Sequence, residues 1–150
     1  MTVDRDRQYI RFTLGEGGYA LPASSVLAVQ ETPSITRLHR AEKYVVGHME
    51  HFGAAIPVID LRVWLELPFC GAGSERCALI LSRARGDEAV LIAALADSVQ
   101  ELVELCPSAI ERGDTLTQYG ELRALTGMAR CGGEYVAVLD PSFIFSSIGA

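Results

Sequence analysis

The segment Gly47 to Leu61, GHMEHFGAAIPVIDL, decides the fold, because much of its pattern recurs near the C-terminal end as GMARCGGEYVAVLD, Gly127 to Asp140. In both copies a glycine is followed six positions later by a second glycine and thirteen positions later by an aspartate. The two sets are Gly47, Gly53, Asp60 and Gly127, Gly133, Asp140. Each copy predicts a turn glycine, a tight hairpin at the second glycine, a buried strand, and an aspartate that ends the strand and begins a helical turn. We therefore expect one small β unit that was built twice.

The composition sets the class of protein. The 150 residues are 49% hydrophobic and 21% charged, which is typical of one globular domain and leaves no room for two domains of ordinary size. A net charge of −6 disfavours binding to nucleic acid or to anionic lipid through general electrostatics, so proteins are the expected partners. The sequence shows no leader pattern and no apolar run of bilayer length, which predicts a cytoplasmic protein without direct membrane insertion.

Short apolar segments separated by glycine and proline predict about five strands in each repeat. We place the first repeat at residues 9–66 and the second at residues 76–148, after a loose N-terminal arm at residues 1–8. The expected strands include residues 9–14, 19–21, 26–31 and 54–59, followed by 78–81, 89–95 and 99–105. Pro57 cannot donate to a strand ladder, so its strand is expected at an edge or at a bulge. Many short strands with frequent turns are typical of small barrels, which makes the fold class all-β.

Two short helices are expected after the repeats. Asp60 can cap a turn at residues 61–65, and Asp140 followed by Pro141 predicts a terminal helix at residues 142–148 that packs Phe143, Ile144 and Phe145 onto the body. Residues 34–44 are predicted to be a polar connection. Residues 111–126 are predicted to be a surface loop with a helical turn near residues 121–125.

No cluster of residues in the sequence indicates catalysis, a cofactor or a metal. His48 and His51 flank Glu50, but their order is not H-E-x-x-H and no third ligand is near, so a surface or partner contact is favoured over metal binding. Asp60 and Asp140 are better explained as duplicated helix caps than as an acid and base pair. The four cysteines are interpreted mainly as small reduced core residues: Cys70, Cys77, Cys106 and Cys131.

Several motifs together resemble the CheW-like domain over nearly the whole chain. They are Phe12-Thr-Leu-Gly15, Tyr19-Ala-Leu-Pro22, Ser24-Ser-Val26, Gly47, Gly53, Ile56-Pro-Val-Ile-Asp-Leu-Arg62, Asp97-Ser-Val-Gln-Glu101 and Val138-Leu-Asp140. The resemblance implies two five-stranded SH3-like β-barrels related by an internal duplication. It also implies a non-enzymatic adaptor that couples the cytoplasmic tip of a chemoreceptor to the regulatory domain of a CheA-type histidine kinase, with recruitment to membrane-associated receptor arrays.

The resemblance also implies which residues bind partners. Val29 and Glu31 match the family's V-x-E strand beside the receptor-facing groove, Arg62 matches the arginine of the D-L-R motif, and Asp97 and Val99 match the D-x-V motif of the second half.

One departure from the family pattern affects the predicted partner contacts. Where typical members have N-L-R-G, this chain has Glu50-His51-Phe52-Gly53, so an aromatic residue replaces the arginine that is associated with receptor and kinase coupling. The change removes bidentate recognition of a carboxylate. Glu50, His51 and Phe52 are candidate partner contacts, in which His51 and Phe52 at a hairpin tip could offer an aromatic anchor in place of an ionic one, or Phe52 could pack on its own barrel.

Three interpretations of function follow from the sequence. The chain is a coupling protein of a specialised or non-flagellar array, or it keeps the fold for a different protein partner, or it is a small-molecule-binding sensor barrel.

Overall fold

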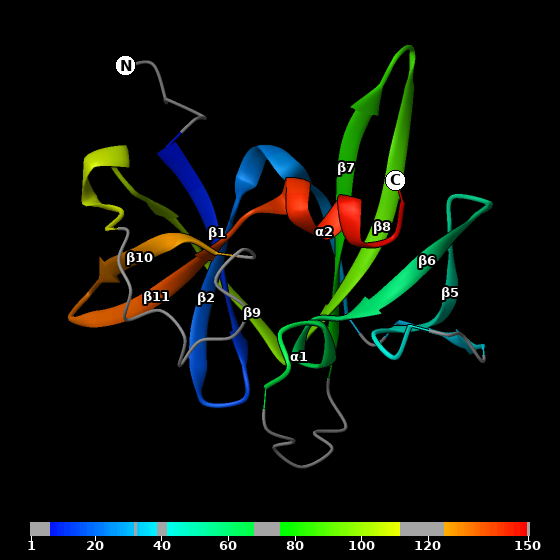
Figure 1. Ribbon diagram of the computed structural model, residues 1–150, viewed down its shortest axis with the longest axis horizontal. Coiled ribbons are helices and arrows are strands. Elements are labelled where there is room, and N and C mark those ends of the chain that lie inside the picture. The colour runs from blue at the N-terminus through cyan, green and yellow to red at the C-terminus, as the bar shows by residue number, and fades with distance from the viewer. Residues whose placement is uncertain (1–6, 32, 39–41, 68–75, 112–124, 150) are drawn as a thin grey trace.

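The computed structural model describes residues 7–31, 33–38, 42–67, 76–111 and 125–149. The fold is all-β, with two antiparallel-rich sheets and short helices, as predicted. Figure 1 shows the two sheets side by side, with helix α2 (Pro141–Ser147) crossing in front of the region where they meet and α1 (Leu61–Trp64) below it. Two 3-10 turns, Ala23–Ser25 and Pro107–Ala109, complete the described elements.

The strands divide into two sheets. The first sheet has the order β10-β11-β2-β1-β9, formed by β1 Gln8–Leu14, β2 Gly17–Pro22, β9 Ser98–Glu104, β10 Leu125–Cys131 and β11 Glu134–Leu139. The second has the order β3-β7-β8-β6-β5-β4, formed by β3 Val26–Glu31, β4 Thr36–Arg37, β5 Val45–His51, β6 Ala54–Asp60, β7 Cys77–Arg85 and β8 Glu88–Ala96. The first sheet thus has five strands, the number expected for each barrel, and the second has a sixth, the two-residue β4.

The sequence repeats and the sheets do not coincide. The β1-β2 hairpin of the first repeat lies in the sheet of the second repeat, through the parallel pair β2-β11. The β7-β8 hairpin of the second repeat lies in the sheet of the first, through the parallel pair β8-β6. When equivalent strands are exchanged (β1 with β7, β2 with β8, β3 with β9, β5 with β10, β6 with β11), the two strand orders become the same apart from β4. The duplication therefore produces two similar sheets that each borrow one hairpin from the other repeat.

Gly47 and Gly127 do not form turns, which corrects the prediction for these two residues. Both lie inside strands, at the register shifts of β5 and β10. A Cβ at Gly47 would lie 1.9 Å from the carbonyl oxygen of Thr36, and a Cβ at Gly127 would lie 2.6 Å from that of Glu111. The neighbouring backbone passes so closely that these positions have no space for a side chain.

The second glycine of each copy lies in a hairpin turn, as predicted. Gly53 has φ 83° and follows Phe52 with φ 49°, while Gly133 has φ 85° and follows Gly132 with φ 55°. Two consecutive residues with positive φ are typical of the type I′ turn, whose twist suits a two-residue hairpin. The two hairpin tips are thus built on the same backbone.

Three segment boundaries differ from the predicted ones. Gln8 belongs to β1 and not to the arm, of which residues 1–6 lie outside the described residues. The predicted connection at residues 34–44 contains β4, and the predicted loop at residues 111–126 ends earlier, because β10 begins at Leu125. Most of the predicted helical turn near residues 121–125 lies outside the described residues.

Pro57 lies on β6, which is an interior strand of its sheet and not the predicted edge strand. From Ala54 to Pro57, β6 has a described pairing with β5 alone, and its pairing with β8 begins at Val58. The missing N–H of Pro57 therefore breaks no hydrogen bond to β8.

The main core joins both sheets. Its largest fully buried side chains include Phe12, Tyr19, Ile59 and Leu81 from strands, with Phe145 from α2. Ile144 and Phe145 are buried and Phe143 packs against the core, as the terminal helix was predicted to do. Two smaller clusters of buried side chains lie apart from this core, one on the strands of each sheet.

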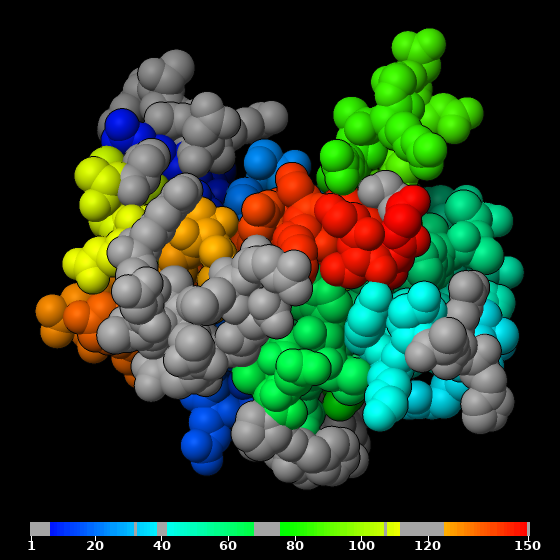
Figure 2. Space-filling model, viewed as in Figure 1, coloured from blue at the N-terminus to red at the C-terminus, as the bar shows by residue number. Residues whose placement is uncertain are grey.

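The β7-β8 hairpin is buried over half its length. Residues 78–81 and 92–96 are buried, but residues 83–89 are exposed, so the inner half of the hairpin alone is enclosed by the body. Figure 2 shows this outer half as an arm that projects from the body.

Both predicted caps are present. The carboxylate of Asp60 accepts a hydrogen bond of 3.0 Å from the backbone N–H of Arg62, and that of Asp140 accepts one of 2.9 Å from the N–H of Ser142. Asp60 is also buried and accepts a 2.8 Å hydrogen bond from Arg76.

The caps lead to a first prediction. We expect Asp140→Ala to lower the free energy of unfolding by about 1 kcal/mol, the usual loss for an N-cap. Asp60→Ala should lower it by about 2 kcal/mol or more, because it also leaves the cation of Arg76 without its partner. Urea unfolding of both variants measures the difference, and an equal effect of the two substitutions would contradict it.

Candidate docking surfaces

The residues predicted to bind partners lie in three separate places. Val29 and Glu31 are on β3, Glu50, His51 and Phe52 are at the end of the β5-β6 hairpin, and Arg62, Asp97 and Val99 are near the junction of the sheets. The structure therefore does not gather them into one site. Whether any of them contacts a partner stays a prediction.

The first place is the β3 face, which we define as Leu27, Val29 and Glu31. β3 is an edge strand of its sheet, and alternate residues along a strand point to the same side. All three residues are exposed, and Leu27 and Val29 retain 58% and 42% of their accessible surface. An exposed aliphatic pair beside a carboxylate can accept a partner that carries apolar and basic groups. The sequence analysis did not name Leu27 as a partner contact. Its spacing of two residues from Val29, which places both on the same side of a strand, was the signal that could have indicated it.

The second place is the hairpin tip, which we define as residues 50–53. Phe52 is 97% exposed, so it does not pack on its own barrel, and that interpretation was wrong. Its ring meets the ring of His51 edge to face, at a centroid distance of 4.6 Å and an interplanar angle of 78°. The tip therefore presents a free aromatic ring beside the exposed Glu50.

The third place is the ion-pair link, which we define as Arg62, Asp97 and Gly15. Arg62 is 5% exposed, and its guanidinium Nη1 donates to Oδ1 of Asp97 at 3.3 Å. Oδ2 of Asp97 accepts a hydrogen bond of 2.5 Å from the backbone N–H of Gly15. The link joins α1, which follows β6 of one sheet, to the β1-β2 turn and the start of β9 in the other. Arg62 is thus buried and paired inside the chain, and Val99 packs against the main core.

The ion-pair link has no counterpart in the other half of the molecule. By the alignment of the repeats, Ser142 takes the place of Arg62, and Ser24 takes the place of Asp97. The sequence motifs marked Arg62 and Asp97 separately as functional residues. They could not show that the two side chains bind each other, because they lie 35 positions apart in the sequence.

The twin of the β3 face lies on β9. Leu102 takes the place of Val29 and is 58% exposed, and Glu104 takes the place of Glu31. On the neighbouring β1, Arg11 forms ion pairs with Glu101 at 3.5 Å and with Glu134. The two edge strands are therefore chemically similar, which provides matched positions for control substitutions.

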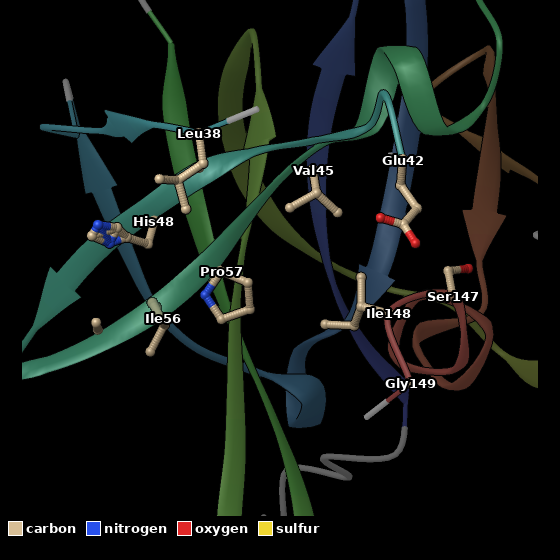
Figure 3. A pocket seen from close by; sticks show the side chains of 11 residues that line it. Leu38, Glu42, Val45, His48, Ile56, Pro57, Ser147, Ile148 and Gly149 are labelled. Atoms are coloured by element: carbon tan, nitrogen blue, oxygen red, sulfur yellow. The ribbon is translucent and has the colours of Figure 1, made fainter. Parts of the chain in front are cut away.

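The larger of the two described cavities has a volume of about 700 Å³ and lies between the β5-β6 hairpin and the end of α2. Figure 3 shows Leu38, Pro57 and Ile148 around it, with His48 at one end and Glu42 at the other. The polar side chains thus do not converge on one point, as they do in most specific small-molecule sites. The second cavity, of about 590 Å³, lies beside α1 and is lined partly by Asp60, Arg62 and Arg76.

Among the described residues, no group of three or more histidine, cysteine, aspartate or glutamate side chains could hold a metal ion. Within the same ranges, no helix is long and apolar enough to cross a membrane.

The described cysteines differ from one another. Cys131 is buried, which raises the pKa of its thiol, whereas Cys106 is exposed and has its pKa lowered by a hydrogen bond from Ser108. Cys106 is therefore not a core residue, contrary to the prediction, and Cys70 lies outside the described residues.

Comparison with known proteins decides the family. The family model for the CheW-like domain matches residues 8–149. The chain belongs to the CheW-like domain family. A curated relative of this CheW-like chain is the chemotaxis protein CheW of Klebsiella aerogenes, 22% identical over 142 residues, which cover 94% of this chain and 82% of the relative. The crystal structure of the scaffolding protein TtCheW from Thermoanaerobacter tengcongensis has the same fold, with a TM-score of 0.81 and 22% identity, covering 97% of this chain and 96% of that one.

Proposed function

We propose that this CheW-like protein is a non-enzymatic adaptor that couples a chemoreceptor to a CheA-type histidine kinase in chemosensory signalling. The observation that carries the proposal is the family match over residues 8–149, since chemotaxis and scaffolding are the roles named for the relatives. A coupling protein works at the cytoplasmic side of receptor arrays and needs no turnover, only two surfaces that can be occupied together.

Two exposed surfaces on one sheet support this proposal. The β3 face and the hairpin tip are separated by β7 and β8, so β3 and β6 lie three strand spacings apart, or roughly 14 Å. Partners on the two surfaces would therefore not compete for the same residues. We assign the β3 face to the receptor tip, because Leu27 and Val29 offer an apolar strip to a helical partner and Glu31 offers a carboxylate to its basic residues. We assign the hairpin tip, as the second exposed surface, to the kinase regulatory domain.

The test measures binding of the purified chain to the receptor signalling tip and to the CheA-type regulatory domain from the same genome. We expect Glu31→Lys to weaken binding of the receptor tip by about tenfold or more, because the charge reversal places a cation where a basic partner group is received. Kinase binding should stay within threefold.

Glu104→Lys, at the twin position on β9, is the matched control and should leave receptor binding unchanged. Binding of neither partner by the unaltered chain would reject the coupling function. An equal loss with both lysine variants would reject the β3 face as the receptor surface.

A second candidate function is a sensor barrel that binds a small molecule. The cavity of about 700 Å³ favours it, since that volume suits a drug-sized ligand. A shift in Tm with metabolites that Ile56→Trp abolishes would support this candidate over the adaptor.

A further inference from the structure

Phe52 combines two features that the fold itself does not require. Its φ of 49° lies in the left-handed region, where a residue with a Cβ is unfavourable. Its ring is 97% exposed, so it gains almost nothing from burial. The twin hairpin makes the same turn with Gly132 at φ 55° and Gly133 at φ 85°, which carry neither disadvantage. Stability of the chain therefore does not explain the phenylalanine.

The environment of Phe52 holds its ring in a presented position. The ring of His51 lies against it edge to face at 4.6 Å, and His51 itself is half-buried at the end of β5. Apart from its two chain neighbours, no heavy atom of the described residues lies within 4 Å of a Cβ placed on the following Gly53, so the turn faces open space at this point. An exposed ring at a hairpin tip has the properties of an interface anchor: a phenylalanine side chain has only two torsions to fix on binding, and its ring buries a large apolar area.

We propose that Phe52 is an aromatic anchor that inserts into a neutral, apolar socket of the kinase regulatory domain. This inference rests on the proposed function and names the chemistry of its second surface. Because the tip is convex, the partner must supply the concave side. Residues 50–53 carry no lysine or arginine, and Glu50 would repel an acidic rim, so the socket is not one built to pair with a cation.

The kinase domain is the committed partner because the β3 face, assigned to the receptor, lies on the far edge of the same sheet. Binding through Phe52 should also be nearly independent of salt, since no ion pair contributes to it.

The key experiment compares three substitutions in the full chain, with titration against the CheA-type regulatory domain and the receptor tip from the same genome. Phe52→Gly should weaken kinase binding by about 30-fold, the loss typical of a central anchor residue. Receptor binding should stay unchanged, and Tm should stay the same or rise, because glycine accepts a positive φ without penalty. A substitution that keeps or raises stability while it removes binding separates function from folding.

Gly132→Phe is the matched control, because it places the same side chain on the same backbone at the twin tip. It should lower Tm by a few degrees, as a left-handed φ becomes strained, and leave kinase binding unchanged. Phe52→Arg restores a cation at this position and should bind the kinase domain as weakly as Phe52→Gly does.

Four results would overturn the inference. Kinase binding of Phe52→Gly within threefold of the unaltered chain would show that the ring is not an anchor. Tight, salt-sensitive binding by Phe52→Arg would show that the socket is ionic. A loss confined to the receptor tip would assign the anchor to the other partner. Self-association by analytical ultracentrifugation that Phe52→Gly abolishes would make a second copy of the chain the occupant. If the unaltered chain binds neither protein, the proposed function itself fails, and this inference with it.

Discussion

Gly47→Ala is expected to lower the free energy of unfolding by about 3 kcal/mol, the largest loss expected for an alanine at any of the described glycines. The added Cβ would lie 1.9 Å from the carbonyl oxygen of Thr36 and 2.9 Å from Cα of Arg37. Both are backbone atoms, so no side-chain rotation can relieve the contact. β4, which has two residues, must separate from β5 and lose its pairing of Thr36 with His48.

Two other glycines serve as controls for this prediction. Gly127→Ala should lower the free energy of unfolding less, by about 2 kcal/mol, because the nearest backbone atom is 2.6 Å away. Gly86→Ala should lower it by about 1 kcal/mol, since it meets no atom within 4 Å and suffers only from its φ of 63°. Urea unfolding at one pH gives all three values. A Gly47→Ala variant that is as stable as Gly86→Ala would show that the close approach of β4 is not essential.

Arg62→Met is expected to lower the free energy of unfolding by about 2–3 kcal/mol. Removing one partner of a buried ion pair is usually strongly destabilising, because the remaining charge loses its counter-ion inside the protein. The expected loss of stability is smaller than is usual for a buried ion pair, because the side chain of Asp97 is 27% exposed and keeps its hydrogen bond from Gly15. Methionine preserves much of the apolar stem of arginine, so the measured loss reports mainly the missing charge.

Arg76→Met is the matched control for this substitution. Arg76 also pairs with an aspartate, Asp60, at 2.8 Å, but its side chain is 24% exposed where that of Arg62 is 6% exposed. The carboxylate that Arg76→Met leaves without a cation is the more buried of the two, since the side chain of Asp60 is 10% exposed and that of Asp97 is 27% exposed. We therefore expect a similar loss, of about 2 kcal/mol. A double-mutant cycle of Arg62→Met with Asp97→Asn isolates the pairwise free energy. A coupling near zero would show that the link between the sheets is not a stabilising contact.

The ion-pair link also bears on the adaptor proposal. Arg62 follows β6, whose hairpin ends in Phe52, while Asp97 and Gly15 belong to the connections of the other sheet. α2 also holds the two sheets together through Ser147. The hydroxyl of Ser147 accepts a hydrogen bond from Trp64 at 2.8 Å, and its backbone carbonyl accepts one from the hydroxyl of Tyr44 at 2.8 Å. The two sheets are thus held in one relative position, which is useful to a protein that keeps other proteins in register.

Much of the fold could be predicted from the sequence because its signals are local. The spacing of glycine, glycine and aspartate in the two copies depends on turn geometry and helix capping, which act over a few residues. Gly53, Gly133, Asp60 and Asp140 accordingly have the predicted roles. Gly47 and Gly127 do not, because a glycine inside a strand and a glycine in a turn look alike until the neighbouring backbone is known.

The candidate site was predicted less completely. The sequence offered Val29, Glu31 and Phe52 as candidate partner contacts, but it could not show that Phe52 is exposed, nor that Leu27 extends the β3 face. It named Arg62 as a partner-binding residue, and it could not show that the chain buries this side chain against Asp97. Exposure and pairing depend on which distant segments pack together, and no local pattern contains that information.

The amino-acid sequence by itself determined that a β unit occurs twice, where most of its strands and the hairpin turns at Gly53 and Gly133 lie, and that each copy ends in a capped helix. Tertiary structure alone decided that the two repeats exchange their β1-β2 and β7-β8 hairpins, so that each sheet contains strands from both halves. The physical reason is that both hairpins present similar apolar faces, and either could cover either repeat. The free energy of packing the shared core, with Phe12 and Leu81 buried in the same cluster, selects between them.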